Sequence, residues 1–216
     1  MWSTRQRAMH ALDTELQAEA STIYEAFELI DEMIEMFRAS PQPTEFSMTC
    51  GLVLLKGRNL GQGIFSLELD GLAQEAGALL RPMIECFELL TYFRKDPQRI
   101  EKAIKGRLPK AGEISKQIQG SFKGLRSHLN YHASHFSLTP GSMLHLIDWR
   151  DGDWKVIQPY NENVLRENLS TLFTVLVFLS FEAASCLGVC GCLPESMVDR
   201  LSVWRDNGRK VFESTA

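Results

Sequence analysis

The sequence lacks several features that would point directly to a function. It has no basic excess, since 23 lysines and arginines stand against 27 aspartates and glutamates and the net charge is −4. A dedicated nucleic-acid binder usually carries a clear positive excess, so this composition disfavours one, although it is compatible with a local basic patch. Gly57, Gly61 and Gly63 are followed by Ile64 rather than by Lys-Ser or Lys-Thr, which excludes a phosphate-binding P-loop.

The chain also lacks a membrane-length apolar run and a secretory signal. Its longest mostly apolar stretch, Leu172–Phe181, falls short of the roughly 20 residues that a spanning helix needs, and Glu182 ends it. The residues after Met1 show no secretory pattern, and the odd number of five cysteines favours a reducing compartment. We therefore expect a cytoplasmic protein that does not enter a membrane.

Three of the cysteines lie close together as Cys186-x3-Cys190-x-Cys192. A zinc knuckle needs a second Cys or His pair at matching spacing, and none follows. The sequence therefore favours small, mostly buried thiols near a helix end, and it predicts neither a bound metal nor another cofactor.

Helical patterns cover most of the chain and predict an all-α helical bundle. Residues 7–38 contain neither Gly nor Pro and place apolar residues at spacings of three and four, which predicts one long amphipathic helix that Pro41 ends. Residues 161–187 are apolar on all sides, so we expect them to form the central buried helix, capped by Asn161 or Asn163. Nothing in 216 residues demands a second domain, so a single domain over residues 1–216 is expected. Further helices are predicted at residues 46–70, 72–94, 97–105, 112–136 and 194–212.

A β-hairpin insertion is predicted at residues 143–158. Asp151-Gly152 forms a two-residue turn signal, and this turn sets the pairing of the two flanking strands. In that register an aromatic pair, a β-branched pair and two opposite-charge pairs face each other. These pairs are Trp149 with Trp154, Ile147 with Val156, Arg150 with Asp153, and Asp148 with Lys155.

Three of the five histidines, His128, His132 and His135, fall within eight residues. On a helix they share one stripe, but the outer two would be about 10 Å apart, too far to bind one metal together. His128 and His132 could chelate a zinc-like ion with a carboxylate from another helix, although the general base of a His-Glu-x-x-His motif is missing. Two other interpretations stay open: hydrogen-bonded histidines that line a cleft or interface, and histidines that contact a ligand or substrate.

The same segment resembles a known family. Arg126-x5-His132 is similar to the Arg-x(4–6)-His signature of the HEPN superfamily, helical proteins that include many RNases of toxin and antiviral systems. A second likeness, to uncharacterised helical proteins related to HEPN and abortive-infection families, covers roughly residues 65–185. It rests on Arg81-x3-Glu85 and Tyr92, followed later by Tyr131-His-Ala-Ser-His135.

The resemblance implies cleavage of RNA without a metal. In such an RNase Arg126 would stabilise the phosphate as charge develops, and His132 would act as general acid or base. Ser127 and Asn130 would orient the histidine or the phosphate. These sites usually form across a dimer, so the resemblance also implies a homodimer with RNA as a partner.

Arg81 and Glu85 also stand out without the resemblance, because they lie one helical turn apart among apolar neighbours. This spacing predicts an inward-facing ion pair beside the histidines, with an exposed salt bridge as the alternative. We expect a non-enzymatic binding or assembly module of HEPN-like type. Its ligand pocket or interface would contain Arg81, Glu85, His128, Tyr131 and His135. A metal-independent endoribonuclease of a defence system and a metal-dependent hydrolase remain alternatives, and the sequence identifies no protein partner.

Overall fold

The structure is a computed structural model that describes residues 2–40, 43–133, 143, 146–155 and 158–213. Helices make up most of this part of the chain, and no strand occurs in it, which confirms the predicted all-α fold. The helices are α1 (Trp2–Asp13), α2 (Gln17–Arg38), α3 (Glu45–Leu69), α4 (Ala73–Lys95), α5 (Arg99–Ile104), α6 (Ala111–Ile118), α7 (Lys123–His132), α9 (Glu162–Val189) and α10 (Glu195–Glu213).

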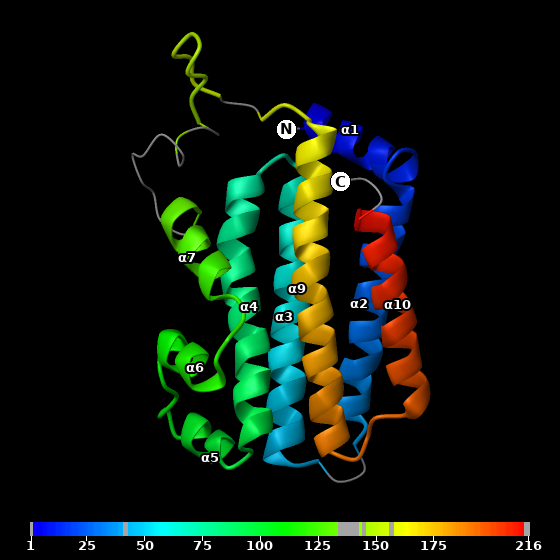
Figure 1. Cartoon of the computed structure of the whole chain (residues 1–216), viewed down its shortest axis with the longest axis vertical. Helices are drawn as coiled ribbons and strands as arrows, with labels where there is room; N and C mark the ends of the chain where they lie inside the picture. Colours follow the sequence, from blue (N-terminus) through cyan, green and yellow to red (C-terminus); the bar gives the residue numbers. More distant parts are fainter. Residues whose placement is uncertain (1, 41–42, 134–142, 144–145, 156–157, 214–216) are drawn as a thin grey trace.

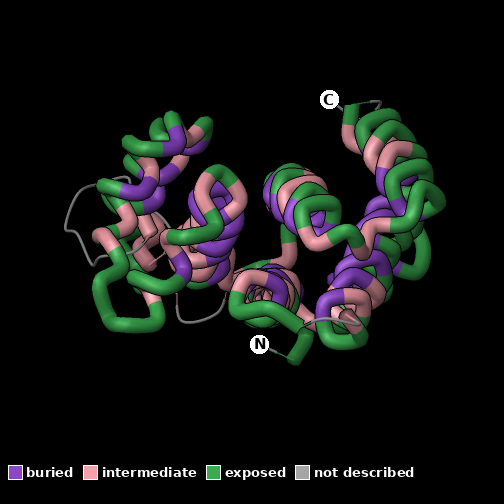
Figure 2. The backbone as a smooth tube through the Cα atoms, turned by 90° about the horizontal axis from the view of Figure 1, so that it is seen from below, coloured by how far each residue is buried: buried purple, intermediate pink, exposed green. Residues whose placement is uncertain are grey.

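Five long helices form the body of the bundle (Figure 1). α2, α3, α4, α9 and α10 run side by side, α5, α6 and α7 follow one another along the outer side of α4, and α1 lies across the upper end. α3 packs most extensively against α4, and α9 contacts α2, α3 and α4. Figure 2 looks along the bundle and shows buried residues on the sides where helices face one another. The helices predicted at residues 46–70, 72–94 and 194–212 correspond closely to α3, α4 and α10.

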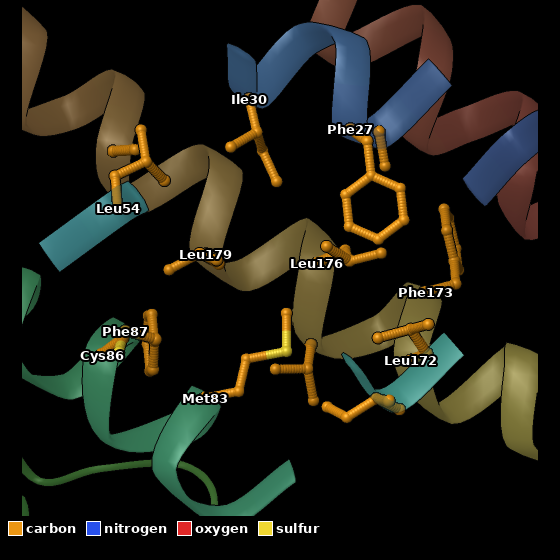
Figure 3. Packing of buried hydrophobic residues seen from close by; sticks show 14 of the residues in the cluster. Phe27, Ile30, Leu54, Met83, Cys86, Phe87, Leu172, Phe173, Leu176 and Leu179 are labelled. Atoms are coloured by element: carbon orange, nitrogen blue, oxygen red, sulfur yellow. The ribbon is translucent and has the colours of Figure 1, made fainter. Parts of the chain in front are cut away.

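The core lies between α2, α3, α4 and α9, where aliphatic and aromatic side chains interdigitate (Figure 3). Two glycines of α3 allow the close approach of these helices. A Cβ at Gly57 would lie 2.9 Å from a methyl of Leu179, and one at Gly61 would lie 3.2 Å from the Phe27 ring. These glycines are therefore packing positions rather than weak points of the helix.

The predicted central helix is present as α9, and Asn161 is its cap, with Oδ1 accepting from the Val164 N–H at 3.1 Å. The expectation that this helix is buried on all sides was wrong, because Thr171, Thr174 and Phe178 are exposed. By length and composition, α9 is the one helix in the described chain that could cross a membrane, and 61% of its most apolar window is buried inside the protein. The expected absence from membranes stays a prediction.

The single helix predicted at residues 7–38 is two helices, α1 and α2, with a turn at residues 14–16. No helix breaker marks this turn. The Leu16 N–H bonds to the Ala11 carbonyl at 2.7 Å, and Leu16 becomes fully buried. Arg5 on α1 binds Asp70 at the end of α3. The turn is favoured because it lets α1 cover the end of the bundle, a gain in burial that local sequence patterns do not reveal.

The helix predicted at residues 112–136 is also divided, into α6 and α7. Gln119 ends α6 in the left-handed conformation, with φ of 57°. Gly120 is the next residue and packs closely against Glu88, since a Cβ at this position would lie 2.7 Å from Glu88 Oε1. The break redirects the chain so that α6 and α7 can both pack on α4.

The β-hairpin predicted at residues 143–158 was wrong. In the described part of this segment there is one isolated antiparallel bridge, which pairs Ile147 with Trp154 instead of Trp149 with Trp154. The carboxylates of Asp148 and Asp151 accept from the N–H groups of Arg150 and Asp153, and the Gly152 N–H bonds to the Asp148 carbonyl. These local bonds favour a longer turn than the two-residue turn that the Asp-Gly signal suggested. Val156 lies outside the described residues.

Candidate functional site

Arg126 lies inside the protein rather than at an accessible surface. It is on α7, its side chain is 10% exposed, and it forms an ion pair with Glu88 of α4, whose side chain is 1% exposed. The Ser115 hydroxyl donates to the other Glu88 oxygen at 2.8 Å. Glu85 Oε1 is 3.7 Å from Arg126 and 3.3 Å from Arg81 Nε. The four charged residues Arg81, Glu85, Glu88 and Arg126 are called the α4–α7 charge cluster below.

The α4–α7 charge cluster joins α4, α6 and α7. Burial raises the pKa of Glu88, while Ser115 and Arg126 act in the opposite direction. A buried carboxylate is tolerated when a cation and a hydrogen-bond donor compensate it, and Glu88 has both. Arg81 and Glu85 are paired as expected, but both are about 30% exposed, so they form the outer rim of the cluster.

The other described residues singled out on α7 are exposed, unlike Arg126. Ser127, His128, Asn130 and Tyr131 are exposed and line a shallow surface depression. The His132 side chain and all of His135 lie outside the described residues, so the predicted pairing of His132 with Arg126 and the histidine stripe stay predictions. The structure brings Arg81, Glu85 and Arg126 together and places His128 against a separate cavity.

This cavity has a volume of about 380 Å³ and opens to solvent between α3, α4, α7 and α9. Glu68 near the end of α3 and Asn168 near the beginning of α9 are among its lining residues. Most of its lining is apolar or small, and the polar side chains come from four helices. The apolar and small lining residues are Ile64, Ala73, Ala76, Gly77, Leu80, Leu125, Leu129, Ala133 and Leu172; the polar ones are Glu68, Gln74, His128, Asn168 and Thr171.

Glu68 is the unusual member of this lining. It is 7% exposed, and its Oε2 atom is buried without a hydrogen-bond partner among the described residues. Burial raises the pKa of Glu68 to about 8. The great majority of buried polar groups in proteins have a hydrogen-bond partner, so a buried carboxyl oxygen without one, on a residue that lines a cavity, requires an explanation. A ligand group or an ordered water in the cavity would supply the missing partner.

The sequence position of Glu68 explains its burial. Leu54, Gly57, Gly61 and Ile64 form the buried stripe of α3 at helical spacing, and Glu68 continues that stripe four residues later. Sequence analysis did not select Glu68, because charged residues near a helix end are ordinarily solvated. A carboxyl at a position where the apolar period demands a core residue was the signal that could have found it.

A second cavity of about 430 Å³ adjoins the first and shares Glu68, Ala73, Gln74 and Asn168 with it. Tyr160 lines it, and the Tyr160 hydroxyl is also buried without a partner in the described part of the chain. Thr4 on α1 donates to the Gln158 carbonyl at 2.8 Å, which holds the segment before α9 against the bundle. Glu68 therefore lies at the junction of two cavities.

The described residues contain no group of three His, Cys, Asp or Glu side chains placed to hold a metal ion. The Cys186–Cys192 segment offers only thiols, of which Cys186 is fully buried. At the end of the bundle that contains Glu68, the structure offers a space for a compact molecule and a carboxyl that can exchange a proton.

Comparisons with protein-family models, with characterised proteins and with solved structures found no match to this chain.

Proposed function

We propose that this protein is a non-enzymatic binding module that holds a small organic ligand in the cavity beside Glu68. The observation that carries the proposal is Glu68, a buried carboxyl that lines an open cavity and whose Oε2 atom lacks a hydrogen-bond partner among the residues described. A binding module is the function expected from the sequence, although the residue at its centre is a different one.

Size and composition of the cavity support the proposal. Ligand sites in proteins are typically concave, about 300–1,000 Å³ in volume, and mostly apolar with a few placed polar groups. The cavity of about 380 Å³, lined mainly by aliphatic and small side chains with Glu68, Asn168 and His128 among them, has this character. The small residues Ala76 and Gly77 on α4 leave room that larger residues would fill.

The RNase alternative draws less support from the arrangement of the charged residues. Its arginine would need to reach a phosphate, but the Arg126 guanidinium is buried against Glu88. Removing a guanidinium from that ion pair would leave the Glu88 carboxylate without its compensating charge. RNA cleavage in excess EDTA, compared among wild type, Arg126→Lys and His132→Ala, tests this alternative. If wild type cleaves RNA and both substitutions abolish the cleavage, the nuclease interpretation would replace that of a binding module.

A cavity-filling substitution tests the proposed binding site. Ala76 is buried and lines the cavity, so Ala76→Leu should occupy much of the space. Ala78→Leu is the matched control, because it places the same side chain on the same helix at a position that lines neither cavity. Wild type and both variants would be screened by ligand-observed NMR against a library of compact fragments.

We expect fragments that bind wild type and Ala78→Leu and that lose binding in Ala76→Leu. Fragments that bind all three proteins equally would place any binding elsewhere. A library that yields no binder to wild type would contradict the proposal. Circular dichroism spectra of both variants that match the wild-type spectrum would show that lost binding does not reflect lost folding.

A further inference from the structure

The titratable side chains around Glu68 include carboxyls and a lysine. The charged or titratable side chains that line the two cavities are Glu68, Asp70, Glu75, His128, Lys155 and Tyr160. Asp70 is already paired, since Arg5 of α1 binds both its oxygens at 2.7 and 2.8 Å. Within the described chain, no Lys or Arg forms an ion pair with Glu68. The carboxyl is therefore without the cation that Glu88 has.

We propose that the ligand of this cavity is a small organic cation, a primary ammonium group on a compact apolar body, and that its ammonium forms an ion pair with the carboxyl group of Glu68. The inference rests on the proposed function and assigns the chemical class of the ligand. The apolar body would lie against Ile64, Leu80 and Leu172, which line the same cavity.

A cation fits this site better than a neutral or anionic group does. An anion would meet the carboxyl of Glu68 in a cavity whose described lining contains no Lys or Arg side chain. A neutral hydroxyl could exchange hydrogen bonds with the protonated carboxyl, but it would leave the carboxylate that forms at higher pH uncompensated, which is costly away from water. An ammonium supplies both the donor and the charge, and charge-assisted hydrogen bonds are roughly twice as strong as neutral ones.

Binding of the cation has a consequence for protons. Glu68 holds a proton in the empty site at neutral pH, because burial raises its pKa to about 8. The bound ammonium favours the carboxylate, so the Glu68 proton leaves to solvent as the ion pair forms. An alkylammonium keeps its own proton over this range, since its pKa resembles that of lysine. Affinity should therefore rise with pH.

The experiment compares three probes of one shape: cyclohexylmethylammonium, cyclohexylmethanol and cyclohexanecarboxylate. Calorimetry and ligand-observed NMR would measure their binding to wild type, Glu68→Gln and Ala76→Leu at about pH 6 and about pH 8.5. Glu68→Gln keeps the shape of the side chain and removes its charge. We expect the ammonium to bind wild type about tenfold or more tightly than the alcohol at the higher pH, and to weaken by well over tenfold at the lower pH. In Glu68→Gln both differences should disappear.

The outcomes separate the ligand class from the site itself. Binding of the alcohol or carboxylate that equals or exceeds that of the ammonium, and that Ala76→Leu abolishes, would overturn the cation and leave the cavity as a binding site. No binding by any probe would overturn both. Ammonium binding that Glu68→Gln leaves unchanged would also overturn the inference, because the carboxylate would then play no part.

Discussion

Glu68 and Glu88 are buried carboxyls on the neighbouring helices α3 and α4, and they differ in their surroundings. Glu88 is 1% exposed, forms an ion pair with Arg126 and accepts from Ser115. Glu68 is 7% exposed, and its Oε2 atom meets no hydrogen-bond donor in the described chain. Glu88 lies under α6 and α7, whereas Glu68 lies at the junction of two cavities.

The difference separates a structural role from a binding role. A buried carboxylate compensated by an arginine and a hydroxyl is saturated, so it can hold helices together but offers little to a ligand. A buried carboxyl without a compensating cation keeps its proton up to a higher pH, and a cation that reaches it favours the charged form. Arg81, Glu85 and Arg126, which the sequence pointed to, belong to the compensated cluster, whereas Glu68 at the centre of the proposed site is a carboxyl of the second kind.

The largest effect is expected from removing the arginine of the α4–α7 charge cluster. Arg126→Ala leaves Glu88 buried without its cation and should lower the free energy of unfolding by about 3–5 kcal/mol. Urea unfolding monitored by circular dichroism would measure this. The control is the double variant Arg126→Met with Glu88→Leu, which should recover most of the loss because apolar side chains can replace a buried ion pair. If the unfolding free energy of Arg126→Ala lay within about 1 kcal/mol of that of wild type, Glu88 would not depend on its cation, and its difference from Glu68 would disappear.

A smaller effect is expected from the pH dependence of Glu68, where a bound proton rather than an ion pair contributes to stability. Burial raises its pKa from 4.5 to about 8, so the folded state binds the proton more tightly than the unfolded chain does. The stability that this proton contributes is complete below about pH 4.5 and is lost as the pH rises through about 8. Relative to Glu68→Gln, wild type should therefore lose about 3 kcal/mol of unfolding free energy between about pH 5 and pH 8.

Urea titrations of both proteins across that pH range would measure this loss, with Glu75→Gln as an exposed control that should follow wild type. Parallel pH profiles for wild type and Glu68→Gln would show that Glu68 has an ordinary pKa and would remove its distinction from other carboxyls.

The two surroundings should also respond differently to an added methyl group. In Gly120→Ala the new Cβ would lie 2.7 Å from Glu88 Oε1 and 2.8 Å from Ser115 Oγ, so the compensated carboxyl would have to shift. We expect a loss of about 1–3 kcal/mol. In Gly77→Ala, beside the cavity, the nearest atom to the new Cβ would be the Ala133 Cβ at 3.2 Å, so the loss of unfolding free energy should be smaller. Thermal unfolding of the two variants would compare them, and an equal or larger loss in Gly77→Ala would go against the tight packing inferred around Glu88.

The smallest effect is expected at the rim of the α4–α7 charge cluster. Arg81 and Glu85 are about 30% exposed and 3.3 Å apart, so water screens their interaction. Arg81→Ala should change the unfolding free energy by less than about 1 kcal/mol, and added salt should reduce the effect further. Denaturant unfolding at low and high salt would test this. A loss as large as that of Arg126→Ala would mean that the rim and the buried pair act as one unit.

Sequence patterns located most helices because each pattern is local. The period of three and four in residues 17–38, the apolar run of α9 and the Asn161 cap all depend on residues within a turn or two of one another. The turn at residues 14–16 and the break at Gln119 could not be found this way. Both are favoured by packing against helices far away in the sequence, on the end of α3 and on α4.

The candidate site was predicted only in fragments. The one-turn spacing of Arg81 and Glu85 gave their pairing, and His128 does line a cavity. The partner of Arg126, however, is 38 residues away on another helix, and no spacing rule connects the two. The apolar period of α3 signals the burial of Glu68, but whether its carboxyl meets a cation or open space depends on what α4, α7 and α9 place around it.

The sequence by itself determined the helical class, the approximate positions of the long helices and the inventory of ionisable groups, because these follow from the period of apolar residues and from composition. Only the tertiary structure decided which glutamate receives an arginine and which one faces an open cavity. Hydrogen bonds and ion pairs act over a few ångströms, and the burial that shifts the pKa of Glu68 is produced by residues distant in the chain. Two glutamates that look alike in the sequence thereby acquire different chemistry.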